Sequence, residues 1–151
     1  MDICGGAINL VDSKLTMSGN KTVSFIGNSA ADYGGAIATD VGYANVIDIS
    51  SNGKVIFQEN LAAGHVKDNH VNGGVGGAIA IGNNGRFMMA GNTGDIEFKK
   101  NLAAAAGGAI YHGGKPHDYS EKNDLLWSEN EGKILFEENV TGGAGGAIYT
   151  L

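Results

Sequence analysis

The chain has 151 residues, a formal net charge of −6 and a pI of about 5.0, and this acidity disfavours nucleic acid binding, which depends on a basic surface. Its 26 glycines follow no Gly-x-y period, which excludes collagen, and a hydrophobic content of 42% argues against simple disorder. The single cysteine, Cys4, excludes an internal disulfide. We expect it to be a small buried residue at a strand start, with a reactive or intermolecular thiol as the alternative.

Two tetrapeptides alternate from one end of the chain to the other. Gly-Gly-Ala-Ile occurs five times, at Gly5, Gly6, Ala7 and Ile8; at Gly34, Gly35, Ala36 and Ile37; at Gly76, Gly77, Ala78 and Ile79; at Gly107, Gly108, Ala109 and Ile110; and at Gly145, Gly146, Ala147 and Ile148. Phe-x-x-Asn occurs four times, at Phe25 and Asn28, Phe57 and Asn60, Phe98 and Asn101, and Phe136 and Asn139. Nine hits in strict alternation indicate a tandem repeat.

The spacing of these motifs defines the unit. From each Phe to the next Gly-Gly the step is 9 residues in three cases and 19 in the other, before Gly76. The unit is therefore about 29 to 32 residues long, with one insertion at 64–75 and a smaller one at 111–124. The whole chain, 1–151, forms a single repeat domain, which we expect to be a fragment of a longer protein because both of its ends lie within the repeat.

Each unit contains three short apolar runs separated by turn residues. The first is Gly-Gly-Ala-Ile itself; the second begins as Leu15-Thr16-Met17; the third leads into the Phe, with a β-branched residue always two positions before it. That period of two places both residues on one face of a strand, and it places Ser24, Ile56, Glu97 and Leu135 on the other. No window has a sustained helical stripe; the best candidate for a helix, 60–63, is short.

Three short strands in each repeated unit predict an all-β fold, a parallel β-helix (solenoid) of about four to five rungs. Stacked rungs bring equivalent side chains together at about 4.8 Å. The motif Phe and Ile residues are then inward stacks, and each motif Asn lies at a corner, where its amide can bond its own turn and the next rung. The paired glycines allow backbone angles or close packing that side chains would forbid. We therefore interpret the motif residues as mainly structural.

No recognisable active site is present in the sequence. The acidic residues are scattered through turns, and the densest pair, Glu137 and Glu138, consists of neighbours that point apart on a strand. Phosphate-loop and calcium-binding glycine motifs are absent. We predict a protein that is not an enzyme, with no catalytic residue, no metal and no cofactor.

The two insertions are the candidate binding loops, because loops on a rigid scaffold often carry function. Their His spacing is not typical of a metal site, so we expect solvated loops. The candidate residues are His65, Lys67, His70, His112, Lys115, His117 and Tyr119. Tyr111 and Tyr149 directly follow motif Ile residues and are either exposed aromatic contacts or ordinary strand residues.

Alternating Gly-Gly-Ala-Ile and Phe-x-x-Asn resembles the repeat pair of the polymorphic membrane proteins of chlamydiae, over the whole chain. The resemblance implies an autotransporter adhesin: a β-helical passenger exported through an outer-membrane barrel to the extracellular side of the bacterial surface, where it takes part in host-cell adhesion and virulence. We expect no signal peptide or membrane segment within these 151 residues, because the first residues lack a basic and an apolar leader region and no apolar run is long enough to span a membrane.

Three functions follow as hypotheses. The first is an adhesin segment that binds a host-cell surface protein as its receptor through the scaffold and its loops. The second is a structural spacer in such a passenger, and the third is a β-helical carbohydrate-active enzyme. Open ends of the coil, without capping rungs, are a further place for self-association.

Overall fold

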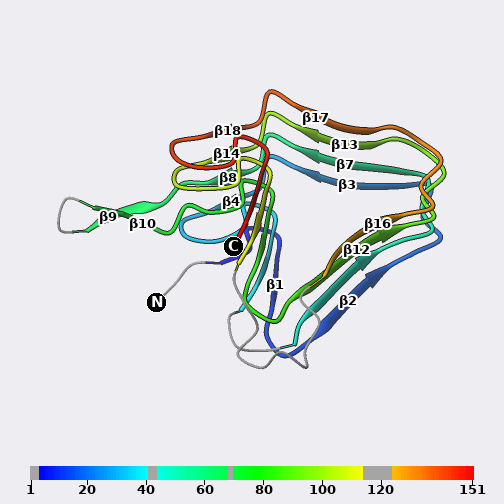
Figure 1. Cartoon of the computed structure of the whole chain (residues 1–151), viewed down its shortest axis with the longest axis horizontal. Coiled ribbons are helices and arrows are strands. Elements are labelled where there is room, and N and C mark those ends of the chain that lie inside the picture. The colour runs from blue at the N-terminus through cyan, green and yellow to red at the C-terminus, as the bar shows by residue number, and fades with distance from the viewer. Residues whose placement is uncertain (1–3, 41–43, 68–69, 114–123) are drawn as a thin grey trace.

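In the computed structural model, which describes residues 4–40, 44–67, 70–113 and 124–151, the chain coils repeatedly through four parallel sheets (Figure 1). The sheet that contains the Gly-Gly-Ala-Ile motifs, here the GGAI sheet, consists of β1 (Ile8–Leu10), β5 (Ile37–Thr39), β11 (Ile79–Ile81), β15 (Ile110–His112) and β19 (Ile148–Thr150). The second sheet consists of β2 (Lys14–Met17), β6 (Val46–Ile49), β12 (Arg86–Ala90) and β16 (Leu125–Ser128). Successive strands of each sheet come from successive rungs, which confirms the predicted β-helix.

The other two sheets follow in chain order. The Phe sheet consists of β3 (Thr22–Ile26), β7 (Lys54–Gln58), β13 (Ile96–Lys99) and β17 (Ile134–Glu137). The corner sheet consists of β4 (Ser29–Ala30), β8 (Leu61–Ala62), β14 (Leu102–Ala103) and β18 (Val140–Thr141). Its two-residue strands give each rung a fourth strand beyond the three expected from the apolar runs, and β8 occupies the segment that was the best candidate for a helix.

The register places like residues on like residues. Phe25 pairs with Phe57, Phe57 with Phe98, and Phe98 with Phe136, and their rings stack with centroids 4.9 to 5.0 Å apart and interplanar angles below 10°. The motif Ile residues pair in the same way, and the three in the middle rungs are fully buried. Burying one such side chain contributes about 1.5–3 kcal/mol, so the stacks supply the apolar core that no single rung can form.

The motif Asn residues of the middle rungs, Asn60 and Asn101, bond to the rungs on both sides. The Asn60 side-chain N–H donates to the carbonyl of Phe25 at 3.0 Å and to Oδ1 of Asn101 at 2.9 Å. Its Oδ1 in turn accepts from the backbone and side-chain N–H groups of Asn28. The predicted amide ladder is therefore present, although its backbone partners lie in adjacent rungs and not in the residue's own turn.

A second Asn ladder, which sequence analysis did not identify, lies at the corner that precedes the Phe sheet in each rung. It consists of Asn20, Asn52, Asn92 and Asn130. The backbone N–H of each of the first three donates to Oδ1 of the next, and the side-chain N–H groups of Asn20 and Asn92 do the same. In both ladders the residue before each Asn has a positive φ; for the Phe-x-x-Asn ladder these residues are Gly27, Glu59, Lys100 and Glu138. One left-handed bend followed by one amide therefore builds both corners.

The two motif glycines do different work. The first has a positive φ in every copy, between 58° and 69°. The second has no room for a side chain in every copy but the last: a Cβ on Gly77, for example, would lie 2.1 Å from the Gly108 carbonyl oxygen and 2.7 Å from the Leu102 backbone nitrogen. Gly-Gly is therefore required both for a left-handed turn and for close approach of the GGAI sheet to the corner sheet.

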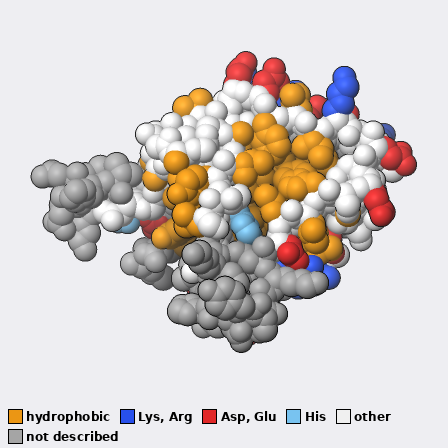
Figure 2. Space-filling model, in the orientation of Figure 1, with side chains coloured by type: hydrophobic (Ala, Val, Ile, Leu, Met, Phe, Trp, Pro, Cys, Tyr) orange, Lys and Arg blue, Asp and Glu red, His pale blue; other side chains and the backbone are white. Residues whose placement is uncertain are grey.

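The last described rung leaves part of the core at the surface. Leu125, Trp127, Phe136 and Ile148 pack against the core but are only partly buried, and Ile134 is 42% exposed. Figure 2 shows hydrophobic side chains gathered inside the outline of the coil in this view. No helix in the described parts of the chain is long and apolar enough to cross a membrane.

Candidate functional site

A two-stranded hairpin projects from the coil at the first insertion (Figure 1). It consists of β9 (His65–Lys67) and β10 (His70–Asn72), paired antiparallel, in contrast to the parallel sheets of the coil. It begins after Gly64 and ends before Gly74, and a Cβ on Gly74 would lie 3.0 Å from the Gly64 Cα atom. The chain therefore leaves the coil and returns at nearly the same point.

The structure shortens the insertion expected at 64–75. Val75 forms parallel bridges with Tyr33 and Ala106, and the N–H of Gly74 donates to the carbonyl of Asp32, so both residues belong to the coil. Ten residues, 64–73, are the true insertion. Without them the step from Phe57 to the next Gly-Gly is the standard nine.

A hydrogen bond fixes the base of the hairpin. Nδ1 of His65 lies 2.6 Å from Oδ1 of Asp32, whose side chain is only 4% exposed, while that of His65 is 49% exposed. Because Asp32 belongs to the preceding rung, this contact ties the insertion to the coil. Sequence analysis named His65 but not its partner, because the pair is separated by 33 residues.

The other predicted loop residues have different outcomes. Lys67 and His70 lie in the hairpin strands. His112 is not in a loop: it ends β15, is 6% exposed, and its Nε2 lies 3.4 Å from the Gly85 carbonyl oxygen. Because side chains alternate along a strand, His112 points inward as Ile110 does, and its side chain is not part of a binding surface. Lys115, His117 and Tyr119 lie outside the described residues.

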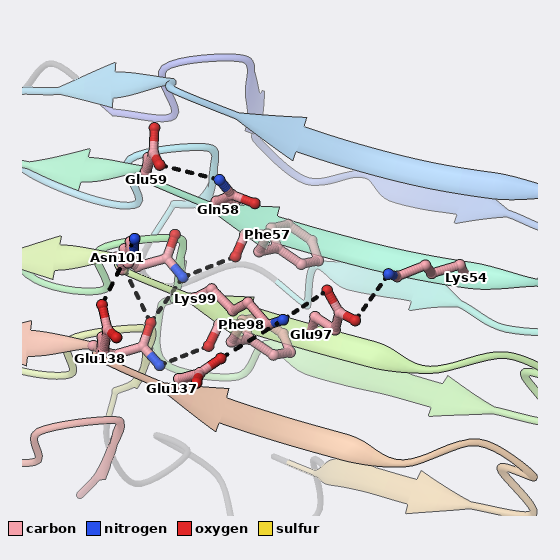
Figure 3. Close-up of polar contacts among 12 residues, drawn as sticks. Lys54, Phe57, Gln58, Glu59, Glu97, Phe98, Lys99, Asn101, Glu137 and Glu138 are labelled. Carbon is pink, nitrogen blue, oxygen red and sulfur yellow. Dashed lines mark hydrogen bonds and ion pairs between the residues drawn. The ribbon is translucent and has the colours of Figure 1, made fainter.

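The outer face of the Phe sheet carries a different side chain in each rung. Ser24, Ile56, Glu97 and Leu135 occupy one register position there. Glu97 is held between two lysines, with Oε1 2.8 Å from Nζ of Lys54 and Oε2 3.3 Å from Nζ of Lys99 (Figure 3). The hydrogen bond from Lys54 lowers the pKa of Glu97, against the effect of its partial burial, and Lys99 lowers it further.

Two further carboxylates in this region form ion pairs with lysine side chains. Glu137 lies 3.6 Å from Lys99 and Glu138 lies 3.7 Å from Lys100, and both carboxylates are more than half exposed (Figure 3). They are the solvated charges expected from the sequence. Among the described residues, no group of three or more His, Cys, Asp and Glu side chains is placed to hold a metal ion.

The outer face of the GGAI sheet is hollowed where the outward side chains are small. Its middle register position is occupied by Asn9, Ala38, Ala80, Tyr111 and Tyr149 in successive rungs. A cavity of about 290 Å³ lies here, lined in part by Asn9, Tyr33, Ala80 and Tyr111. Cys4, which is half-buried and forms no disulfide, also lines the cavity. Its backbone forms a parallel β-bridge with Tyr33 in the next rung.

A family model described as the Chlamydia polymorphic membrane protein repeat matches residues 22–40, 95–113 and 133–151. Each match runs from a Phe strand through the corner to a GGAI strand, and none of the three contains the hairpin. The matched segments are therefore plain rungs, and the hairpin is an addition to the repeat.

Several curated proteins are similar to this chain. "Probable outer membrane protein pmp13" of Chlamydia pneumoniae is 40% identical over 93 residues, 62% of this chain and 8% of the relative. "Probable outer membrane protein pmp7" of the same species is 36% identical over 99 residues, 64% and 10% respectively. "Probable outer membrane protein PmpF" of Chlamydia muridarum is 30% identical over 123 residues, 82% and 11%. The chain thus spans about a tenth of the length of these relatives. No solved structure matches it.

Proposed function

This chain belongs to the polymorphic membrane protein family of chlamydiae, and from that premise we propose that it is a non-catalytic segment of a bacterial surface adhesin that binds a host-cell surface protein. The parent is then an outer-membrane protein, as the names of the relatives suggest, and we propose that its coil lies on the extracellular side. The observation that carries the proposal is the contrast between a repeated interior and an exterior that changes from rung to rung.

The projecting hairpin is the contact we favour. It extends away from the coil, it is absent from the plain rungs, and the Asp32–His65 pair holds its base in one position. A hairpin that is already held in position loses less conformational entropy on binding a partner than a free loop does. β-Strands in the hairpin also offer backbone edges for an extended partner segment.

The test is binding of the 151-residue chain to cultured host cells, with and without a deletion of residues 64–73. The deletion joins Ala63 to Gly74, which restores the standard spacing of the repeat, and we therefore expect the circular dichroism spectrum and the melting temperature to be retained. We expect binding to fall by about tenfold or more, the usual effect of losing a central contact. Protease treatment of the cells should abolish binding of the parent chain.

A matched control is Ser24→Ala, an exposed position on the outer face of the Phe sheet. This variant should bind as the parent does. If the parent chain, correctly folded, does not bind cells at all, the adhesin proposal is wrong and a structural spacer is the better account. If the deletion variant binds as the parent does, the hairpin is not the contact.

A further inference from the structure

The cavity on the outer face of the GGAI sheet has the build of a small-molecule site. It is lined where Ala80 contributes only a methyl group to a row that Asn9 begins and Tyr111 continues. Ala80 is only 2% exposed and lies at the floor. The volume of the cavity, about 290 Å³, is near the lower limit for ligand cavities, about 300 Å³. A ligand of one ring, or of one ring and a substituent, therefore matches it in size.

Two tyrosines supply aromatic surface to this cavity. Tyr33 lies before β5 and forms parallel β-bridges with Cys4 and Val75, and Tyr111 lies in β15. Tyr111 is supported from behind by Tyr149, with ring centroids 5.7 Å apart and an interplanar angle of 18°. Burial raises the pKa of Tyr111, with smaller contributions from Tyr149 and Tyr33, so its phenol keeps its proton and remains a hydrogen-bond donor at neutral pH.

Polar groups converge on the same space. A Cβ built on Gly113 would lie 2.9 Å from Cε1 of Tyr111 and 3.4 Å from Oδ1 of Asn83, so the ring edge and the amide oxygen face one point. Gly113 keeps that point open. Asn9 and Asp40, both exposed, add an amide and a carboxylate to the lining.

The charge of the lining restricts the ligand. Among the described residues that line the cavity there is one carboxylate, Asp40, and no Lys, Arg or His. Phosphate, sulfate and carboxylate groups need cationic partners or backbone nests, and this lining offers no side chain of that kind. A purely apolar ligand would leave the amide of Asn83 without a partner in the complex. What remains is an uncharged ligand with both an apolar face and several hydroxyl groups.

We propose that this cavity binds one neutral sugar unit, a hexose or N-acetylhexosamine at the end of a glycan chain. The apolar C–H face of the pyranose packs against the ring of Tyr111, as flat amphipathic groups pack on aromatic faces. The amide groups of Asn83 and Asn9 and the carboxylate of Asp40 bind its hydroxyl groups, each of which both donates and accepts. This site is separate from the hairpin and does not depend on the protein contact proposed above.

The experiment is saturation-transfer NMR on the 151-residue chain with methyl glycosides of glucose, galactose and N-acetylglucosamine, each at about 10 mM, since single sugars bind weakly. Choline and N-acetylneuraminic acid are the charged probes. We expect transfer to at least one neutral glycoside and not to N-acetylneuraminic acid. An absence of transfer to all three neutral glycosides, or transfer to choline alone as in an aromatic cation cage, would overturn the proposal.

Variants locate the binding. Asn83→Ala and Tyr111→Ala should each raise the dissociation constant about tenfold, because each removes one of the two groups that face the open point. Ser24→Ala is the matched control: Ser24 is exposed on the outer face of the Phe sheet and is not among the residues that line the cavity, so this variant should change the constant by less than about twofold. Circular dichroism checks folding, and Asn83→Ala, a loop substitution, keeps the test valid if Tyr111→Ala unfolds. Equal losses in Asn83→Ala and Ser24→Ala would also contradict the proposal.

Discussion

The two faces of the Phe sheet differ in how much their residue types vary from rung to rung. On the inner face, every rung has an aliphatic residue followed two positions later by Phe, and in the middle rungs these side chains are fully buried. On the outer face of the same strands, the rungs carry a hydroxyl, an aliphatic group, a carboxylate and another aliphatic group in turn. Adjacent residues of one strand therefore obey different constraints.

This difference has a simple physical origin. Inside the coil each side chain contacts its equivalents above and below, so one change disturbs two neighbours, and stacking in register favours identical residues. Outside, water takes the place of a missing contact, and a substitution costs little. The interior maintains the coil, while the exterior is free to diverge and carry binding.

The first prediction tests the interior side of this contrast. Phe98→Ala should lower the free energy of unfolding by about 3–5 kcal/mol, because it leaves a cavity between the rings of Phe57 and Phe136. Urea unfolding followed by circular dichroism measures this loss. Phe136→Ala, at the partly exposed end of the stack, should cost less. A Phe98→Ala variant that unfolds with the parent would contradict the stacked core.

The second prediction concerns a close backbone approach between two rungs of the coil. Gly77→Ala should destabilise the chain by about 3 kcal/mol, because the new Cβ would lie 2.1 Å from the Gly108 carbonyl oxygen and the two rungs must separate. Gly146 occupies the same motif position in the last rung, and a Cβ there meets nothing within 4 Å. Gly146→Ala should therefore unfold within about 0.5 kcal/mol of the parent. Equal melting of the two variants would show that the contact between the sheets is not what requires the glycine.

Much of the coil followed from the sequence because the strongest signals were local and repeated. Phe98, Ile110 and Asn101 recur at fixed spacing, and their stacking needs only the rung-to-rung distance. The Asn20–Asn130 ladder was missed because its residues lie among different turn residues. One signal was available: an Asn occurs five or six residues before every motif Phe.

The candidate sites were harder to predict because they depend on contacts between rungs. His65 was named, but the Asp32 carboxylate that holds it belongs to the preceding rung. His112 was placed in a loop because the second insertion was taken to begin directly after Ile110, whereas β15 continues to His112. The cavity combines Asn9, Ala80 and Tyr111 from three different rungs, and together they form no motif in the chain.

The last and smallest effect belongs to the exterior. The hydrogen bond from Lys54 makes the pKa of Glu97 lower in the folded chain than in the unfolded chain. The charged carboxylate therefore stabilises the fold when the pH is above the pKa of an unfolded glutamate, about 4.3. This stabilisation is lost as the pH falls through the folded pKa. Glu97→Gln should therefore lower the melting temperature at pH 7 by at most roughly 2–4 °C, equivalent to about 1 kcal/mol or less. The gap to the parent should narrow as the pH falls below the unfolded pKa and close once the pH is below the folded pKa. Glu131→Gln, an exposed turn position without an ion pair to any described residue, should show no such gap. If Glu97→Gln destabilised the chain as much as Phe98→Ala and did so at every pH, the outer face would be as constrained as the core, and the contrast between the two faces would fail.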